Sequence, residues 1–270
     1  PAGSTPELFA ERLRAVKARG FRGAKTTLPL FYGASGEADS VDYSGIRGAI
    51  DGSLKETEYL PTATLDAIAA FFAAGRDAVG PGFELMLDCH GRLSPANAIR
   101  LSHALEPFGL FWLEEPIPPE SAEDLARVRA ASRVPIAAGE RLSSIYEVRP
   151  FLLAGAVDFL QCDLVSCGGI TGARKIAALA EAHYVPFAPH NPNGPIATAA
   201  AAQLLTAIPN ASLLETVGSA VDDERFAAIV DEPLLASDGM ISVGERPGLG
   251  LDILEGAVEK FPCEPRTAPR

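Results

Sequence analysis

One pattern recurs along the chain from about residue 80 onward: a short apolar run ends in an acidic residue or a histidine, and a segment with helical periodicity follows. Successive runs end 23 to 27 residues apart. Short, almost entirely apolar runs are typical of strands buried on both faces, and each gap has room for a crossover helix. The pattern therefore predicts parallel βαβ units. The six runs end at Asp88, Glu114, Glu140, Asp163, His190 and Glu215.

A seventh unit precedes these six. The spacing of apolar residues predicts an amphipathic helix over 6–20, followed by a strand over 21–27 that carries Lys25. Between this strand and a helix predicted over 65–79 lies an irregular stretch, 33–64, which is rich in Gly, Ser and Asp. We expect a long surface loop there, which is either a lid or a variable loop.

Strands that alternate with helices over 270 residues favour an α/β fold, a TIM-type (β/α) barrel, which takes about 250 residues. We assign residues 1–237, with seven strands, to the barrel domain. Residues 238–270 form a C-terminal extension that completes the barrel or cap region. A closed barrel needs eight strands, and one missing strand would leave two open edges. We therefore expect the chain to be a fragment that lacks the first strand.

The composition limits the partners and the compartment. With 35 acidic and 23 basic residues, the chain carries a net charge of −12, which disfavours binding to nucleic acid or to an anionic membrane surface. The sequence has no apolar stretch long enough to span a membrane and no signal-peptide pattern, so we expect neither membrane insertion nor export. Cys89 and Cys162 lie within apolar runs, and no CxxC spacing occurs. A reduced, cytoplasmic environment is the resulting expectation.

Three consecutive predicted strands end in a carboxylate: Asp88, Glu114 and Glu140. In parallel α/β barrels the carboxyl ends of the strands form the active-site face, so these three groups should converge. Converging carboxylates repel one another unless a proton or a cation intervenes, and oxygen-only ligation favours Mg²⁺. The alternative is a set of salt bridges to Arg92 or Arg141. Glu115 should point away because of strand alternation, and it is the weaker candidate.

Two histidines flank this predicted metal site. His190 ends the run next to the one that ends in Asp163, and a carboxylate beside an imidazole raises its basicity, so the pair is a candidate general base. Beside a metal ion, such a base can take the α-proton of a carboxylate. His90 is the candidate for a second histidine, which can protonate a β-hydroxyl as it leaves. The combination of base, metal ion and acid predicts a dehydratase. His103 and His183 lie in helical segments, where we expect ordinary surface or packing residues.

Several segments together resemble the mandelate racemase and muconate lactonizing enzyme branch of the enolase superfamily. The histidine two residues after the first metal ligand, with APH and GGIT, is most similar to sugar-acid dehydratases of the galactonate dehydratase type. The resemblance covers nearly the whole chain and implies an N-terminal capping domain, which we expect to be missing together with the first strand. The segments are LDCHGR (87–92), WLEEP (112–116), AAGER (137–141), QCDLVSCGGIT (161–171), APHNPNGPIA (188–197), LLET (213–216) and RPGLGLD (246–252).

The resemblance implies a Mg²⁺-dependent dehydratase, assembled as a homo-oligomer, that converts a sugar acid (an aldonate) to a 2-keto-3-deoxy acid. It also implies three sets of residues. These are the metal ligands Asp88, Glu114 and Glu140, the catalytic residues His190, Asp163 and His90, and the contacts to the substrate's carboxylate, Lys25 and Glu215.

Two departures separate the chain from related activities. Racemases of the family carry a Lys-x-Lys pair, but the string here is Lys25-Thr26-Thr27. The missing second lysine disfavours a racemase or epimerase of a 2-hydroxy acid, which is one alternative. Mannonate dehydratases typically carry an aspartate four residues past the histidine, where this chain has Gly194. A non-catalytic acid-sugar-binding relative is the other alternative.

Overall fold

The computed structural model describes residues 5–27, 60–216, 227–234 and 236–260. Its larger sheet is parallel, in the order β1-β2-β3-β4-β5, and single parallel bridges from Leu160 to Phe187 and from Phe187 to Ala211 extend it beyond β5. This order follows the chain, as expected for consecutive βαβ units. The strands are β1 (Gly23–Thr27), β2 (Glu84–Asp88), β3 (Trp112–Glu114), β4 (Ile136–Ala138) and β5 (Phe159–Leu160).

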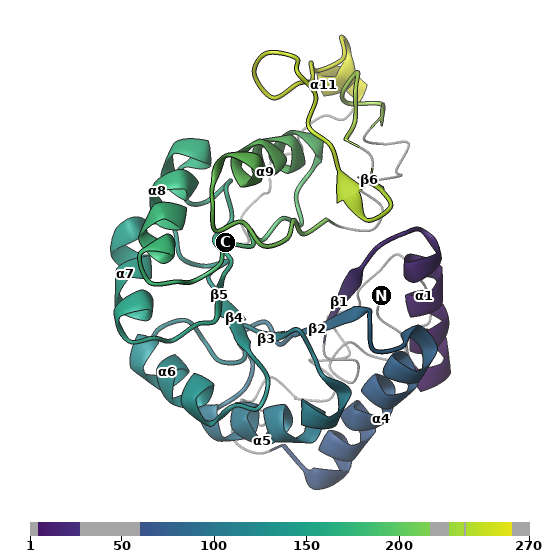
Figure 1. Cartoon of the computed structure of the whole chain (residues 1–270), viewed down its shortest axis with the longest axis vertical. Coiled ribbons are helices and arrows are strands. Elements are labelled where there is room, and N and C mark those ends of the chain that lie inside the picture. Colours follow the sequence, from purple (N-terminus) through teal and green to yellow (C-terminus); the bar gives the residue numbers. More distant parts are fainter. Residues whose placement is uncertain (1–4, 28–59, 217–226, 235, 261–270) are drawn as a thin grey trace, which may run out of the picture.

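Helices surround the strands in an arc on the outside of this curved sheet (Figure 1). The first two of these helices, α1 (Pro6–Ala18) and α4 (Thr62–Val79), approach closely because Gly75 of α4 has no side chain. A Cβ at this position would lie 2.7 Å from the Phe9 ring and 2.8 Å from Leu13, both on α1. The other helices in this arc are α5 (Pro95–Leu105), α6 (Ala122–Ala131), α7 (Ile145–Leu153), α8 (Gly169–Glu181) and α9 (Pro195–Ala207).

Short polar side chains fix where several of these helices begin. Ser94, Ser121 and Ser144 precede α5, α6 and α7, and each accepts a hydrogen bond from the backbone N–H three residues further on. Thr5 does the same at the start of α1. Such a cap stabilises a helix by about 1 kcal/mol and fixes the residue at which the helix begins.

The core has two layers. The larger layer lies between helices and sheet and includes the fully buried Phe72, Leu87, Leu113 and Ile136. The smaller layer consists of Met86, Trp112, Ala137 and Ala188, packed with Phe111, Phe159 and Leu213. Both faces of the central strands are thus covered by apolar side chains, which explains why their sequences lack polar alternation.

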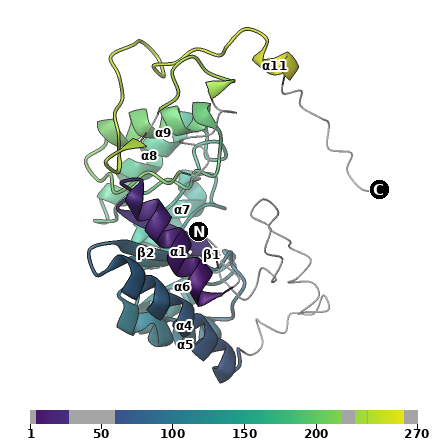
Figure 2. The same ribbon diagram turned by 90° about the vertical axis from the view of Figure 1, so that its right-hand side faces the viewer.

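The C-terminal segment adds a hairpin and a short helix. The antiparallel strands β6 (Ala236–Ser237) and β7 (Met240–Ile241) are joined by a turn that lies against the residues before β1. A Cβ on Gly239 would be 2.6 Å from the carbonyl oxygen of Gly20, so the glycine permits this close contact. Figure 2 shows helix α11 (Ala257–Lys260) beyond α9. The hairpin spans the boundary that we expected between residues 237 and 238.

The structure confirms the expected α/β barrel architecture and corrects several details. The runs that end at His190 and Glu215 contribute single bridges rather than regular strands. The helix expected over 65–79 begins at Thr62, inside the stretch 33–64 that was expected to be a loop, and residues up to 59 of that stretch lie outside the described residues. The helix expected over 6–20 ends at Ala18. No described helix is both long and apolar enough to cross a membrane.

Replacing Arg76 by Met should lower the free energy of unfolding by about 2–4 kcal/mol. The Arg76 guanidinium, on α4, donates hydrogen bonds to the carbonyl oxygens of Gly80 (2.8 Å), Phe83 (2.6 Å), Phe108 (2.9 Å) and Gly109 (3.0 Å). It therefore ties the helix to the loops before β2 and β3. Urea denaturation measures the change.

Arg127→Met is the control, because Arg127 contacts Asp124 only one helical turn away on the exposed face of α6. Its effect should stay within about 0.5 kcal/mol. Equal effects of the two substitutions would contradict the structural role of Arg76.

Candidate active site

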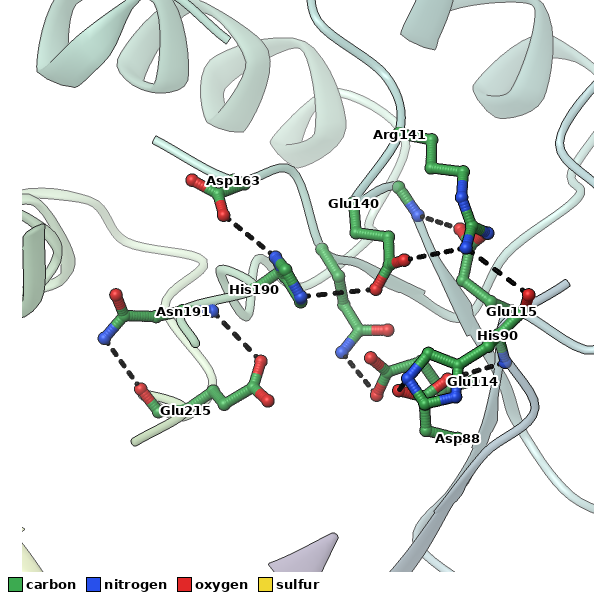
Figure 3. Close-up of polar contacts among 12 residues, drawn as sticks. Asp88, His90, Glu114, Glu115, Glu140, Arg141, Asp163, His190, Asn191 and Glu215 are labelled. Atoms are coloured by element: carbon green, nitrogen blue, oxygen red, sulfur yellow. Dashed lines mark hydrogen bonds and ion pairs between the residues drawn. The ribbon is translucent and has the colours of Figure 1, made fainter. Parts of the chain in front are cut away.

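Three carboxylates converge at the carboxyl ends of neighbouring strands. Asp88 ends β2, Glu114 ends β3, and Glu140 lies two residues past β4. Each offers an oxygen, and these oxygens lie within 4.8 Å of one another (Figure 3). We call Asp88, Glu114 and Glu140 the acidic cluster. Gly139 lets the chain place Glu140 in the acidic cluster. The φ of Gly139, 136°, is a backbone conformation that glycine adopts readily, and a Cβ at this position would lie 3.0 Å from the backbone nitrogen of Gln161.

The acidic cluster fits a hard divalent cation. Glu140 Oε2 is buried and accepts no hydrogen bond from the described residues. Burial, together with the charges of Asp88 and Glu215, raises the pKa of Glu114 to about 8 against the opposing effect of Lys25. A buried acceptor without a hydrogen bond, next to carboxylates that repel one another, is the environment in which a bound Mg²⁺ would be stabilising.

Lys25 reaches the acidic cluster from β1. Its Nζ lies 2.5 Å from Glu114 Oε1, 2.7 Å from Glu215 Oε1 and 3.9 Å from Asp88 Oδ2. Lys25 pairs with Met86, two residues before the end of β1, and its long side chain spans the remaining distance to the carboxylates. Burial disfavours the ammonium, yet the three carboxylates raise the pKa of Lys25 above its usual value.

Asp163 and His190 form the expected pair. His190 Nδ1 lies 2.9 Å from Asp163 Oδ2, which also accepts a hydrogen bond from the Asn193 amide at 2.9 Å. Because the carboxylate accepts at Nδ1, the other ring nitrogen is left as the basic atom. That atom, Nε2, lies 3.3 Å from Glu140 Oε2 (Figure 3), so the base faces the acidic cluster.

His90 lies on another side of the acidic cluster (Figure 3). Its ring Nε2 is 3.0 Å from Asp88 Oδ2, and its backbone N–H donates to Asp88 Oδ1 at 2.9 Å. The residue adopts a positive φ of 52°, which turns the ring back over the strand that precedes it. Burial alone would raise the pKa of Asp88, but the hydrogen bond from His90 and the charge of Lys25 lower it.

Glu215 closes the site beside Lys25. Its Oε2 accepts a hydrogen bond from the backbone N–H of Asn191 at 3.0 Å, and its Oε1 pairs with Lys25. The buried Asn191 amide donates to the Glu215 carbonyl oxygen at 3.0 Å and to the Thr198 hydroxyl at 2.9 Å. The carboxylate that we expected to contact substrate is therefore held by the loop that carries His190.

Sequence reasoning missed two donors that orient Glu114. Its Oε2 accepts hydrogen bonds from Trp112 Nε1 at 3.0 Å and from Gln161 Nε2 at 2.9 Å, while Oε1 faces Lys25. Strand alternation could have found both, because each lies two residues before a predicted site residue, Glu114 or Asp163, and so shares its face. Asn191 and Asn193 had no such signal, since they lie on a loop.

Glu115, His103 and His183 lie outside the acidic cluster, as the sequence predicted. Glu115 points away from it and accepts hydrogen bonds from the Gly139 N–H and from Arg141. His103 contacts the carbonyl oxygen of Ala131 at the surface of α5, and His183 follows the end of α8. The salt bridges weighed as an alternative are present in part, since Arg141 also lies 3.3 Å from Glu140 Oε1.

Lys25→Met should lower the free energy of unfolding by about 3–5 kcal/mol in the presence of a chelator, because it leaves buried carboxylates without their cation. The double variant Lys25→Met/Glu114→Gln should recover part of this loss, since Glu114, the closest partner, is then neutral. Chemical denaturation of the three proteins measures both changes.

Lys175→Met, on the exposed face of α8, is the matched control and should change stability by less than about 0.5 kcal/mol. A loss for Lys25→Met no larger than the control's would refute the charge balance described above.

Comparison with known proteins identifies the fold. Residues 8–257 match the family described as enolase C-terminal domain-like. A D-galactonate dehydratase of Variovorax paradoxus is 40% identical over 196 residues, which are 71% of this chain and 51% of that protein. A D-galactonate dehydratase family member of Streptomyces bingchenggensis is 36% identical over 203 residues, 73% of this chain and 48% of that protein. The chain thus spans about half the length of these curated relatives.

A solved structure agrees with these matches. The mandelate racemase/muconate lactonizing enzyme-like protein of Rubrobacter xylanophilus superposes with a TM-score of 0.81 at 34% identity. The superposition covers 96% of this chain and 63% of that one. The fold is therefore the C-terminal barrel domain of the enolase superfamily, and the chain belongs to the enolase C-terminal domain-like family.

Proposed function

We propose that this chain carries the catalytic barrel of a Mg²⁺-dependent dehydratase that removes water from a sugar acid. The observation that supports this most is the position of the His190 Nε2 atom, 3.3 Å from the acidic cluster, with a second histidine on another side of that cluster. Relatives named as D-xylonate and D-gluconate dehydratases, besides those for D-galactonate, support the substrate class.

The acidic cluster is the proposed metal site, with Asp88, Glu114 and Glu140 as ligands. A bound Mg²⁺ supplies positive charge that stabilises the negative charge developing on the substrate's carboxylate. Lys25 and Glu215 are the proposed contacts to that carboxylate. The ammonium of Lys25, which lies within ion-pair distance of Glu114 and Glu215, would supply positive charge to an anionic group of the substrate.

The proposed reaction moves one proton from the substrate to His190 and one proton from His90 to the leaving hydroxyl. His190 Nε2 takes the α-proton, and Asp163 stabilises the resulting imidazolium through Nδ1. The electrons of the C–H bond form the double bond between Cα and Cβ, the bond from Cβ to the 3-hydroxyl breaks, and His90 protonates the hydroxyl, which leaves as water. The enol product then tautomerises to the 2-keto-3-deoxy acid.

The cellular setting is part of the same proposal. Three cysteines of the described residues, Cys89, Cys162 and Cys167, are buried and unbridged, which supports a reduced compartment such as the cytoplasm. A homo-oligomer remains an expectation from the family.

Saturating Mg²⁺ should raise the melting temperature of the chain by about 5–10 °C, since binding at 100 times Kd stabilises by about 2.7 kcal/mol. Glu114→Gln removes a ligand charge and should abolish the shift, whereas the exposed Glu181→Gln at the end of α8 should keep it. Differential scanning fluorimetry measures all three. A full shift in Glu114→Gln would count against the metal site.

His190→Asn should lower both water loss and α-proton exchange by about 10²–10⁴-fold, because it removes the base. His90→Asn should lower water loss by a similar factor while exchange continues, because it removes the acid alone. Proton NMR in deuterated water, with a panel of aldonates, follows both reactions.

His103→Asn is the control and should behave as the wild type. Exchange without any water loss in the wild-type chain would favour a racemase or epimerase instead, and undiminished turnover by His190→Asn would refute the assignment of the base.

A further inference from the structure

Arg141 brings a positive charge to the edge of the acidic cluster. It follows Glu140 directly, and its Nη2 lies 3.3 Å from Glu140 Oε1 and 3.3 Å from the carbonyl oxygen of His90. Its Nη1 makes the shorter contact, 2.7 Å from Glu115 Oε2 (Figure 3). A guanidinium that moved fully onto Glu140 would compete with a metal ion for the same carboxylate.

Glu115 has the features of a residue built for this contact. It is 2% exposed, although a carboxylate is rarely buried, and it lies in the left-handed region with φ 39°. The turn at Glu115 directs its side chain away from the acidic cluster and toward the β4 end. There Oε1 accepts the Gly139 N–H at 3.0 Å, and Oε2 accepts Arg141.

Both contacts of Glu115 act on Glu140. The hydrogen bond to Gly139 holds the residue before Glu140, and the ion pair holds the residue after it. Glu140 Oε2, by contrast, is buried and accepts no hydrogen bond from the described part of the chain. The arrangement leaves one oxygen of this carboxylate directed at the site while the neighbouring guanidinium is neutralised elsewhere.

We propose that Glu115 is a positioning residue that keeps Arg141 from moving fully onto Glu140, so that Glu140 Oε2 stays available to the metal ion. The inference rests on the proposed function, because it requires the acidic cluster to bind a divalent cation. It assigns Arg141 the role of a competitor that must be restrained, and it predicts opposite effects for the two members of one ion pair.

Mn²⁺ binding to the full chain, followed by electron paramagnetic resonance, tests the inference without a substrate. Glu115→Gln keeps the shape of the side chain but releases Arg141 toward Glu140, so the Kd for Mn²⁺ should rise about 10–100-fold. Arg141→Gln removes the competitor, so its Kd should equal the wild-type value or fall below it. The double variant Glu115→Gln/Arg141→Gln should return to within about threefold of the wild type.

Asp158→Asn is the matched control. Asp158 also accepts a backbone N–H, from Ile136 at 2.8 Å, and an arginine, Arg129 at 2.6 Å, but it lies before β5 rather than at the mouth of the site. Its substitution should destabilise the fold without changing the Kd for Mn²⁺. Circular dichroism of each variant shows whether it is folded.

Two results would overturn the inference while leaving the proposed function intact. One is an unchanged Kd in a folded Glu115→Gln variant. The other is weaker Mn²⁺ binding by Arg141→Gln, which would make Arg141 a support of Glu140 rather than a competitor, and this single variant decides the matter if Glu115→Gln does not fold. Failure of the wild-type chain to bind Mn²⁺ would instead overturn the metal site, and the inference with it.

Discussion

An excess of negative charge in a buried space is the constraint on which this barrel depends. Asp88, Glu114, Glu140 and Glu215 meet at its mouth, and Lys25 is the one ammonium among the described residues within ion-pair distance of three of them. Burial and the neighbouring carboxylates together raise the pKa of Glu114 to about 8, so a negative charge at this position costs free energy. A divalent cation would remove that cost, so the crowding of these carboxylates favours a metal ion at this position.

Neutral donors keep the crowded carboxylates in fixed orientations. Trp112 and Gln161 hold one oxygen of Glu114, and Asn191 and Asn193 hold Glu215 and Asp163. A neutral donor orients a carboxylate without cancelling its charge, which an arginine at the same place would do. Arg141 is tolerated beside Glu140 because another buried carboxylate neutralises it.

The regular part of the fold and the position of most candidate residues at or near strand ends were predictable from the sequence, because both follow from local rules. A parallel strand buried on both faces must be apolar, and its polar end must lie at the carboxyl edge of the sheet. Asp88 and Glu114 lie at strand ends for this reason, and the 4.8 Å convergence with Glu140 follows. The single bridges at Phe187 and Ala211 were not predictable, since their ladder depends on how the sheet curves.

The sequence by itself determined the order of strands and helices, the residue type at each strand end, and the pairing of Asp163 with His190. Tertiary structure alone decided which atom each group faces. Lys25 lies two residues short of its strand end and still reaches three carboxylates, and the turn at Glu115 sends a second carboxylate to Arg141. The physical reason is that chain order and periodicity define a face, whereas distances of 3 Å depend on backbone torsion, side-chain length and the curvature of the packed sheet.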